Sequence, residues 1–345
     1  MRVFSLRHCL LLLFCFQPFS VPAADLFLFP SGLILTRGEA YLDWSNRFQR
    51  GTDYFNGSGD RTSLFPGGSR ETYLDAVSTL SLAYGLTDTF TLYTNIPFRY
   101  RKETNTYHAD AFGLGDVIAG IRFGLMRDRS DEHSVALDLS AKFPTGRSNI
   151  GFNDASQGVA LTLPLGSGNS DISLAAVFRQ ICGSRFEFQE SIQYKRRIQA
   201  LSEYLASTGF SFSDSNGNVY VLPIGNLKIK WGDEIETRIG SRAKVFENVF
   251  LSVGFTYLWR LNTVVDSFMF VPAGAGTDSV VDEIVFAQSH YLSGRLDLSY
   301  RASPIWSYHV GWNHPLFGKN YPITSLAFVE GLLGDQYTIG VSYAF

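Results

Sequence analysis

Apolar and polar residues alternate through most of this chain, and the last nine residues show the pattern most cleanly. From Tyr337 to Phe345, large apolar or aromatic side chains alternate with small or polar ones. A period of two predicts a strand with one apolar face and one polar face. A chain that ends on an aromatic residue in such a strand is typical of a barrel whose last strand faces lipid and closes against the first.

Twelve segments carry this alternation. In the first of them, Ala40, Leu42, Trp44 and Phe48 share one face. The segment that contains Glu190 is the least regular, because this carboxylate falls on the apolar face. The expected strands are residues 39–48, 72–84, 90–100, 116–126, 134–143, 171–179, 186–195, 233–244, 249–260, 291–301, 305–312 and 337–345.

The connections between the expected strands alternate between short and long. Short turns fall near Gly85, Arg127, Cys182, Phe246 and Ala302, and longer loops separate them. This alternation is typical of an outer-membrane barrel, in which brief periplasmic turns alternate with long extracellular loops. The predicted fold is therefore all-β, a transmembrane antiparallel up-and-down β-barrel of about twelve strands with long extracellular loops.

Aromatic side chains gather beside the short turns. Tyr84, Phe90, Phe186, Phe250 and Trp306 are examples. Their repeated position predicts an aromatic girdle at the periplasmic boundary of the membrane.

The first 23 residues have the features of a secretory signal peptide. Arg2 and Arg7 precede a short apolar run, and Ala23 ends a cleavage site of small residues. The run is too short to span a bilayer, and no other apolar stretch approaches the roughly 20 residues that a membrane helix needs. We therefore expect export across the inner membrane of a Gram-negative bacterium, with residues 24–345 forming a single barrel domain in the outer membrane.

Composition narrows the possible functions. The formal net charge is −3, and loss of Arg2 and Arg7 would take it to about −5, which does not favour nucleic acid as a partner. Cys182 would be the only cysteine of the mature chain, which excludes an internal disulfide and a cysteine metal cluster. The sequence shows no metal-ligand spacing and no nucleotide fingerprint, so no cofactor is expected.

If the apolar faces of the strands meet lipid, their opposite faces line the lumen. Charges of both signs occur there, so a strongly ion-selective funnel is not expected. These charges could pair across the lumen as structural bridges, or they could line a path for a solute. A barrel of about twelve strands should be narrow or partly plugged. The candidate lumen-lining residues are Asp43, Arg47, Asp75, Arg99, Asp116, Arg122, Asp138, Lys142, Glu236, Arg238, Arg242, Arg295 and Asp297.

The long loops carry more apolar residues than exposed segments usually do. They could cap the barrel and bind a hydrophobic solute, or they could only pack on each other. Ile198, Leu201 and Leu205 recur at helical spacing in the long 196–232 insertion, which predicts a short amphipathic helix above the barrel. The candidate residues of an apolar mouth are Phe210, Phe212, Tyr220, Phe268, Phe270 and Phe286.

Three short glycine motifs carry a resemblance to a known family. They are Gly113-Leu-Gly-Asp116, Phe143-Pro-Thr-Gly146 and Gly166-Ser-Gly168, the last followed by Asp171. With the closing aromatic strand, they make residues 73–345 resemble the outer-membrane proteins of the MetA-pathway of phenol degradation family. That family is distantly similar to the fatty-acid and toluene outer-membrane channels. The resemblance implies a barrel linked to the uptake of small hydrophobic or aromatic compounds.

Three classes of function compete. A channel or binding barrel for small hydrophobic molecules is the first, and a structural or adhesive barrel without transport is the second. The third is an outer-membrane hydrolase, which needs a histidine beside a nucleophile or a carboxylate pair near the rim. His108 near Asp110, and His314, are the nearest candidates but lie in no nucleophile motif, so we expect no enzyme. The expected partners are outer-membrane lipid, lipopolysaccharide, a small hydrophobic ligand, and the barrel-assembly machinery, which would recognise the strand ending in Phe345.

Overall fold

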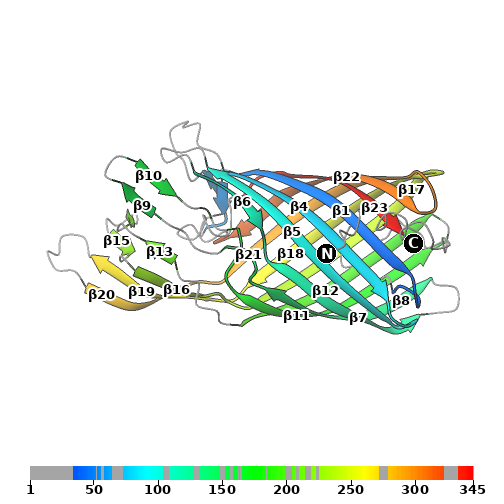
Figure 1. The fold of residues 1–345 in the computed structure, drawn as a ribbon, viewed down its shortest axis with the longest axis horizontal. Helices are drawn as coiled ribbons and strands as arrows, with labels where there is room; N and C mark the ends of the chain where they lie inside the picture. The colour runs from blue at the N-terminus through cyan, green and yellow to red at the C-terminus, as the bar shows by residue number, and fades with distance from the viewer. Residues whose placement is uncertain are drawn as a thin grey trace, which may run out of the picture.

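The computed structural model describes residues 34–344, with gaps at 52, 56–57, 64–72, 104–108, 128–131, 148–151, 156–157, 162, 164, 184, 199–203, 207–209, 214–218, 223–224, 272–278 and 322–332. Within these residues, the regular secondary structure consists of strands (Figure 1). The described part of the chain holds no helix long and apolar enough to cross a membrane.

Twelve antiparallel strands close into one barrel (Figure 1). Consecutive barrel strands pair with each other, and the first strand pairs with the last from Tyr41 opposite Ala344 to Gln49 opposite Gln336. The predicted fold is therefore confirmed. The barrel strands are β1 (Ala40–Gly51), β4 (Tyr73–Gly85), β5 (Phe90–Glu103), β7 (Val117–Arg127), β8 (His133–Phe143), β11 (Ser170–Cys182), β12 (Phe186–Ile198), β17 (Glu234–Phe246), β18 (Val249–Arg260), β21 (Ser289–Arg301), β22 (Trp306–Lys319) and β23 (Gln336–Ala344).

The period of two in the sequence separates an outer face from an inner face. Trp44 is 52% exposed on the outside of β1, whereas the preceding Asp43 is 8% exposed on the inside. Because lipid offers no partner for a polar group, the apolar residues occupy the outer face and the polar residues the inner face. Glu190 is an exception, since it lies on the exposed face of β12 beside Phe178 and Ile239 of the neighbouring strands.

The short turns lie at one end of the barrel, and both ends of the described chain meet there. Gly38 donates a backbone hydrogen bond to Gly85 over 2.9 Å, and Ala344 donates one to Ile305 over 3.0 Å. Leu35 is buried inside this end, where its backbone N–H donates to the hydroxyl of Thr91 over 2.9 Å. The residues that precede β1 therefore narrow the short-turn end of the lumen.

One member of the expected aromatic girdle is misplaced. Tyr84, Phe90, Phe186 and Trp306 are exposed on the outer face. The ring centroid of Phe250, however, lies 4.1 Å from the guanidinium carbon of Arg242, an inner-face residue. The girdle prediction is wrong for Phe250, because its register places it inside, where it stacks under a cation.

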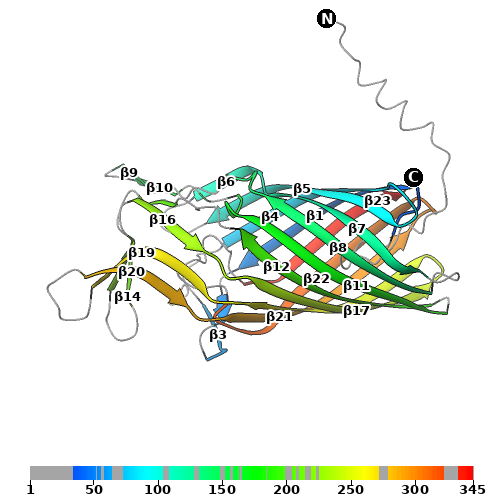
Figure 2. The same cartoon turned by 90° about the horizontal axis from the view of Figure 1, so that it is seen from below.

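The connections at the other end build a second layer of strands beyond the barrel (Figures 1 and 2). The helix expected there is wrong at Ile198, which ends β12 opposite Ser170, and at Leu205, which lies in a strand opposite Asn226. Leu201, the third residue of the expected helix, lies outside the described residues. Cross-strand pairing overrides the weak helical spacing in this segment. β6 (Ala109–Leu114) is not part of this layer, because it pairs with β5 in the barrel sheet. The additional strands are β2 (Asp53–Phe55), β3 (Arg61–Ser63), β9 (Phe152–Ala155), β10 (Gly158–Leu161), β13 (Tyr204–Ala206), β14 (Phe210–Ser213), β15 (Val219–Leu222), β16 (Gly225–Lys230), β19 (Thr263–Val271) and β20 (Ser279–Phe286).

The pairing of β1 with β23 can be tested with an engineered disulfide. Gln49 and Gln336 are register partners whose side chains share a 3.0 Å hydrogen bond, and paired residues in an antiparallel ladder are about 4.5–5.5 Å apart at Cα. Gln49→Cys with Gln336→Cys, in a Cys182→Ser background, should therefore form a disulfide on mild oxidation. The measurement is the mobility of the heat-unfolded chain in non-reducing electrophoresis.

The matched control pairs Gln49→Cys with Gln189→Cys, which lies in β12 on the far side of the barrel. This pair should stay reduced in the monomer. Equal cross-linking of both pairs, or of neither, would contradict the closure between the first and last strands.

Candidate functional site: the barrel lumen

A cavity of about 620 Å³ occupies the lumen. Leu35, Tyr41 and Thr91 line it toward the short turns, and Arg47 and Lys195 line it toward the loops. The walls come from strands on every side of the barrel, so the cavity is a property of the closed sheet and not of one hairpin.

The structure brings most of the predicted lumen residues together around this cavity. Asp75, Arg99, Arg242 and Asp297 are not in its lining, although each forms an ion pair on the inner face. The predicted residues that line the cavity are Asp43, Arg47, Asp116, Arg122, Asp138, Lys142, Glu236, Arg238 and Arg295.

The charged side chains pair along the wall and leave the middle of the lumen open. Arg122 of β7 lies opposite Asp138 of β8 in the register, and its guanidinium donates to that carboxylate over 2.9 Å. Tyr93 of β5 donates to the same carboxylate over 2.5 Å. Buried charges need such partners because their desolvation is costly. Since β5, β7 and β8 are consecutive strands of the wall, this network does not bridge the lumen.

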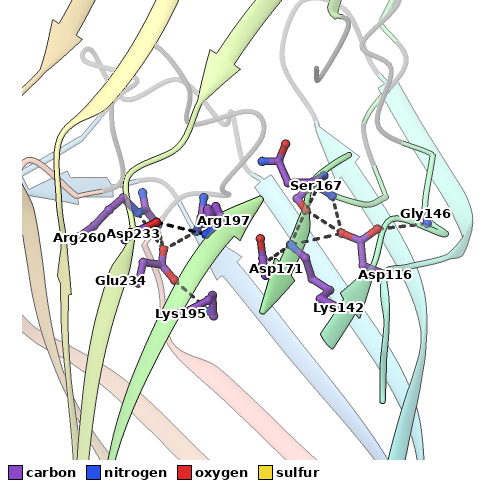
Figure 3. A network of polar contacts seen from close by, with 11 residues as sticks. Asp116, Lys142, Gly146, Ser167, Asp171, Lys195, Arg197, Asp233, Glu234 and Arg260 are labelled. Carbon is purple, nitrogen blue, oxygen red and sulfur yellow. Dashed lines mark hydrogen bonds and ion pairs between the residues drawn. The ribbon is translucent and has the colours of Figure 1, made fainter. Parts of the chain in front are cut away.

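A second network holds the wall to the long connection before β11 (Figure 3). Asp116 accepts hydrogen bonds from the backbone N–H of Gly146 over 3.2 Å, and from the backbone N–H and hydroxyl of Ser167 over 2.7 and 2.8 Å. Lys142 lies 2.6 Å from Asp171 and 3.8 Å from Asp116. A carboxylate that accepts several N–H and O–H groups is a strong anchor for a loop.

The network around Asp116 leaves no room for a side chain at glycine positions of the three motifs. A Cβ on Gly166 would lie 2.2 Å from a carboxylate oxygen of Asp116, and one on Gly146 would lie 2.8 Å from Gly166. Gly168 has a φ of 70°, the left-handed region that glycine adopts without strain. The motifs that carry the family resemblance therefore converge on Asp116 and fix the loop against β7 and β8.

A third network surrounds Glu234 at the start of β17 (Figure 3). Lys195 donates to this carboxylate over 2.9 Å and Arg260 over 2.9 Å, and Arg197 forms a further ion pair with it. The guanidinium carbons of Arg197 and Arg260 lie 5.1 and 5.5 Å from the ring centroid of Trp231. Glu234 is only 2% exposed, so three cations share one buried carboxylate.

The predicted lumen set lacked these cations. Lys195, Arg197 and Arg260 lie near strand ends, beyond or at the boundaries expected for their strands. The alternation of Lys195 and Arg197 on the inner face of β12 is the signal that could have found them.

The residues expected to form an apolar mouth lie in the second layer of strands. Phe212 is opposite Tyr220 and Tyr220 is opposite Phe270 in the backbone register, while Phe268 is in β19 and Phe286 ends β20. Phe210 is opposite Leu222 at the other end of the β14–β15 hairpin. The apolar segments thus pair with one another as strands.

The two histidine candidates are separate. His108 lies outside the described residues. His314 is on β22, where its Nδ1 lies 2.5 Å from a carboxylate oxygen of Asp335. A histidine and a carboxylate are two of the three groups that a nucleophilic hydrolase needs.

A closed antiparallel barrel with an apolar outer wall and a charged lumen is an outer-membrane type of barrel. The family model described as MetA-pathway of phenol degradation matches residues 45–180. The resemblance seen in the sequence is confirmed over that range, which begins earlier and ends sooner than residues 73–345. No curated protein matches the sequence.

Two solved structures are similar to this chain, and the first of them shows the same fold. An outer membrane channel from Pseudomonas putida F1 is 14% identical, with a TM-score of 0.59, over 90% of this chain and 97% of its own. A mutant of the TodX monoaromatic hydrocarbon channel is 8% identical, with a TM-score of 0.47, over 90% of each chain.

The Asp116 network predicts the effect of adding one methyl group. Gly166→Ala should lower the free energy of unfolding by about 2–4 kcal/mol, because the new Cβ displaces a buried carboxylate from its hydrogen bonds. Urea unfolding in detergent or lipid vesicles measures this change. Gly294→Ala is the control, since its nearest contact would be a Leu316 side-chain atom at 3.3 Å. Equal destabilisation by both variants would contradict the anchoring role of Asp116.

Proposed function

We propose that this protein is a channel of the bacterial outer membrane that takes up small hydrophobic or aromatic compounds. The observation that carries the proposal is the hollow lumen, in which about 620 Å³ remains open inside a closed barrel. The match to a family described by phenol degradation supports an aromatic solute. The likeness to an outer membrane channel supports the barrel architecture.

The lining suits a small solute with an aromatic body. Between the charged groups, the cavity is lined by Val77, Pro97 and Ile118, and by the rings of Tyr41 and Tyr93. Ligand sites commonly combine such apolar surfaces with a few polar groups that fix orientation. Because the charges are engaged with neighbours on the wall, a neutral solute can pass without displacing an ion pair.

The proposal includes the route by which the chain reaches the membrane. Residues 1–23 would be removed as a signal peptide, leaving 24–345 as the barrel domain. The apolar outer wall would contact lipid, with lipopolysaccharide at the loop end, and the strand ending in Phe345 would be read by the barrel-assembly machinery. We propose no enzymatic activity. The pair of His314 and Asp335 would need a nucleophile in addition to serve a hydrolase.

Single-channel recording tests the channel proposal. The purified barrel in a planar bilayer should give discrete conductance steps, and millimolar benzyl alcohol should reduce them by occupying the lumen. Thr79 lines the cavity. Thr79→Trp should therefore lower the unit conductance by about twofold or more, because the larger side chain narrows the pore.

Leu80→Trp is the matched control, because Leu80 is the next residue of β4 and faces the outside. Its conductance should equal that of the unmodified protein. A folded barrel that never conducts would contradict the channel proposal and would favour a structural or adhesive barrel.

A further inference from the structure

Three arginines gather round one carboxylate at the loop end of β1, β4 and β5. Arg99 holds Asp75 with two hydrogen bonds of 2.7 and 2.5 Å. Arg101 lies 3.6 Å from the same carboxylate, and Arg47 lies 3.9 Å from it. Asp75 is 3% exposed and Arg101 is 1% exposed, while the side chain of Arg47 is 42% exposed to the lumen. Arg47 is thus the most loosely held and most accessible member of the cluster.

The Glu234 network repeats this arrangement on β12, β17 and β18. There Lys195, Arg197 and Arg260 share one carboxylate. The side chain of Lys195 is 28% exposed, compared with 14% for Arg197 and 4% for Arg260. Lys195 is therefore the accessible member here, as Arg47 is in the first cluster.

The two clusters face each other. In the strand order of the closed sheet, β1, β4 and β5 lie opposite β12, β17 and β18. Each cluster sits where its strands meet the long connections. Arg47, Lys195 and Arg197 all line the same cavity, so a solute in the loop-proximal lumen lies between two groups of cations.

The charge balance of these clusters is positive. Around Asp75, three arginines face one carboxylate. Around Glu234, three cations face two carboxylates, because Asp233 accepts a hydrogen bond from the backbone N–H of Arg197 over 3.2 Å (Figure 3). A partly solvated charge attracts an opposite charge far more strongly than the same charge does in bulk water. On the wall between the two clusters, Lys142 is paired with Asp116 and Asp171, and Asp171 is the register partner of Arg197. The cations that face the cavity with the fewest carboxylates around them are therefore those of the Asp75 cluster.

We propose that the loop-proximal lumen is a binding site for a small aromatic carboxylate, whose carboxylate sits between Arg47 and Lys195. A guanidinium binds a carboxylate through two parallel N–H groups, which adds geometry to the charge. The aromatic body of the solute would lie against Val77 and Pro97 of the same cavity. This inference deepens the proposed channel function by naming the solute class, and it rests on the lumen being the route.

Calorimetric titration of the detergent-solubilised barrel tests binding without requiring conduction. Benzoate should bind, and benzyl alcohol, which has the same ring without the charge, should bind at least about tenfold more weakly. Arg47→Gln and Lys195→Gln should each weaken benzoate binding by about five- to tenfold. Arg47→Lys should restore part of the loss. The carboxylates keep two cations each in the Gln variants, so the barrel should still fold, as its heat-modifiable electrophoretic mobility would show.

The chain offers matched controls for both positions. Arg50→Gln lies in β1 and Arg196→Gln in β12, and both native side chains are exposed on the outer face. Neither control should change benzoate affinity. Equal affinity for benzoate and benzyl alcohol would overturn the proposal, as would loss of binding in the controls alone. Inorganic phosphate that competes as well as benzoate would overturn the aromatic assignment.

Failure of this inference can be told apart from failure of the channel. A barrel that conducts but does not discriminate benzoate from benzyl alcohol leaves the channel standing and removes the carboxylate site. A silent barrel that binds benzoate through Arg47 and Lys195 keeps the site and removes the channel.

Discussion

The structure depends on the need to satisfy every backbone hydrogen bond where lipid offers none. An open sheet would leave two unpaired edges in the hydrocarbon, so the chain brings β1 against β23 and closes the barrel. Closure also fixes the faces, because each residue then points either to lipid or into the lumen. The exposed Trp44 and the buried Asp43 follow from that single constraint.

The inner faces of the strands carry charged side chains, which must be stabilised within the confined space of the lumen. Arg122 and Asp138 do so as register partners on adjacent strands, and Asp116 does so by taking hydrogen bonds from the backbone of a long connection. Because these partners lie along the wall, the centre stays hollow. Arg47 and Lys195 belong to clusters in which cations outnumber carboxylates, and both face a shared cavity. This arrangement gives the lumen a chemical preference as well as a diameter.

The barrel was predictable because a period of two is a local signal that each strand repeats. All twelve strands were expected near their observed positions. The girdle was less accurate, because it rested on nearness to a turn and not on the face of the strand. Phe250 precedes the exposed Leu251 and therefore points inward. The second layer of strands depends on pairing between segments far apart in the chain, such as Tyr220 with Phe270. Spacing alone instead suggested a helix near Leu205. The roles of Gly166 and Asp116 required knowing which loop meets which strand.

The most direct test of the account is a cysteine scan along β23, from Gln336 to Ala344, with each cysteine spin-labelled in lipid vesicles. Accessibility to oxygen, which concentrates in lipid, should peak at Tyr337, Ile339 and Val341. Accessibility to a water-soluble nickel chelate should peak at the positions between them. The two profiles should therefore alternate out of phase with a period of two. Profiles that rise and fall together, or that lack this period, would contradict a lipid-facing wall around a polar lumen.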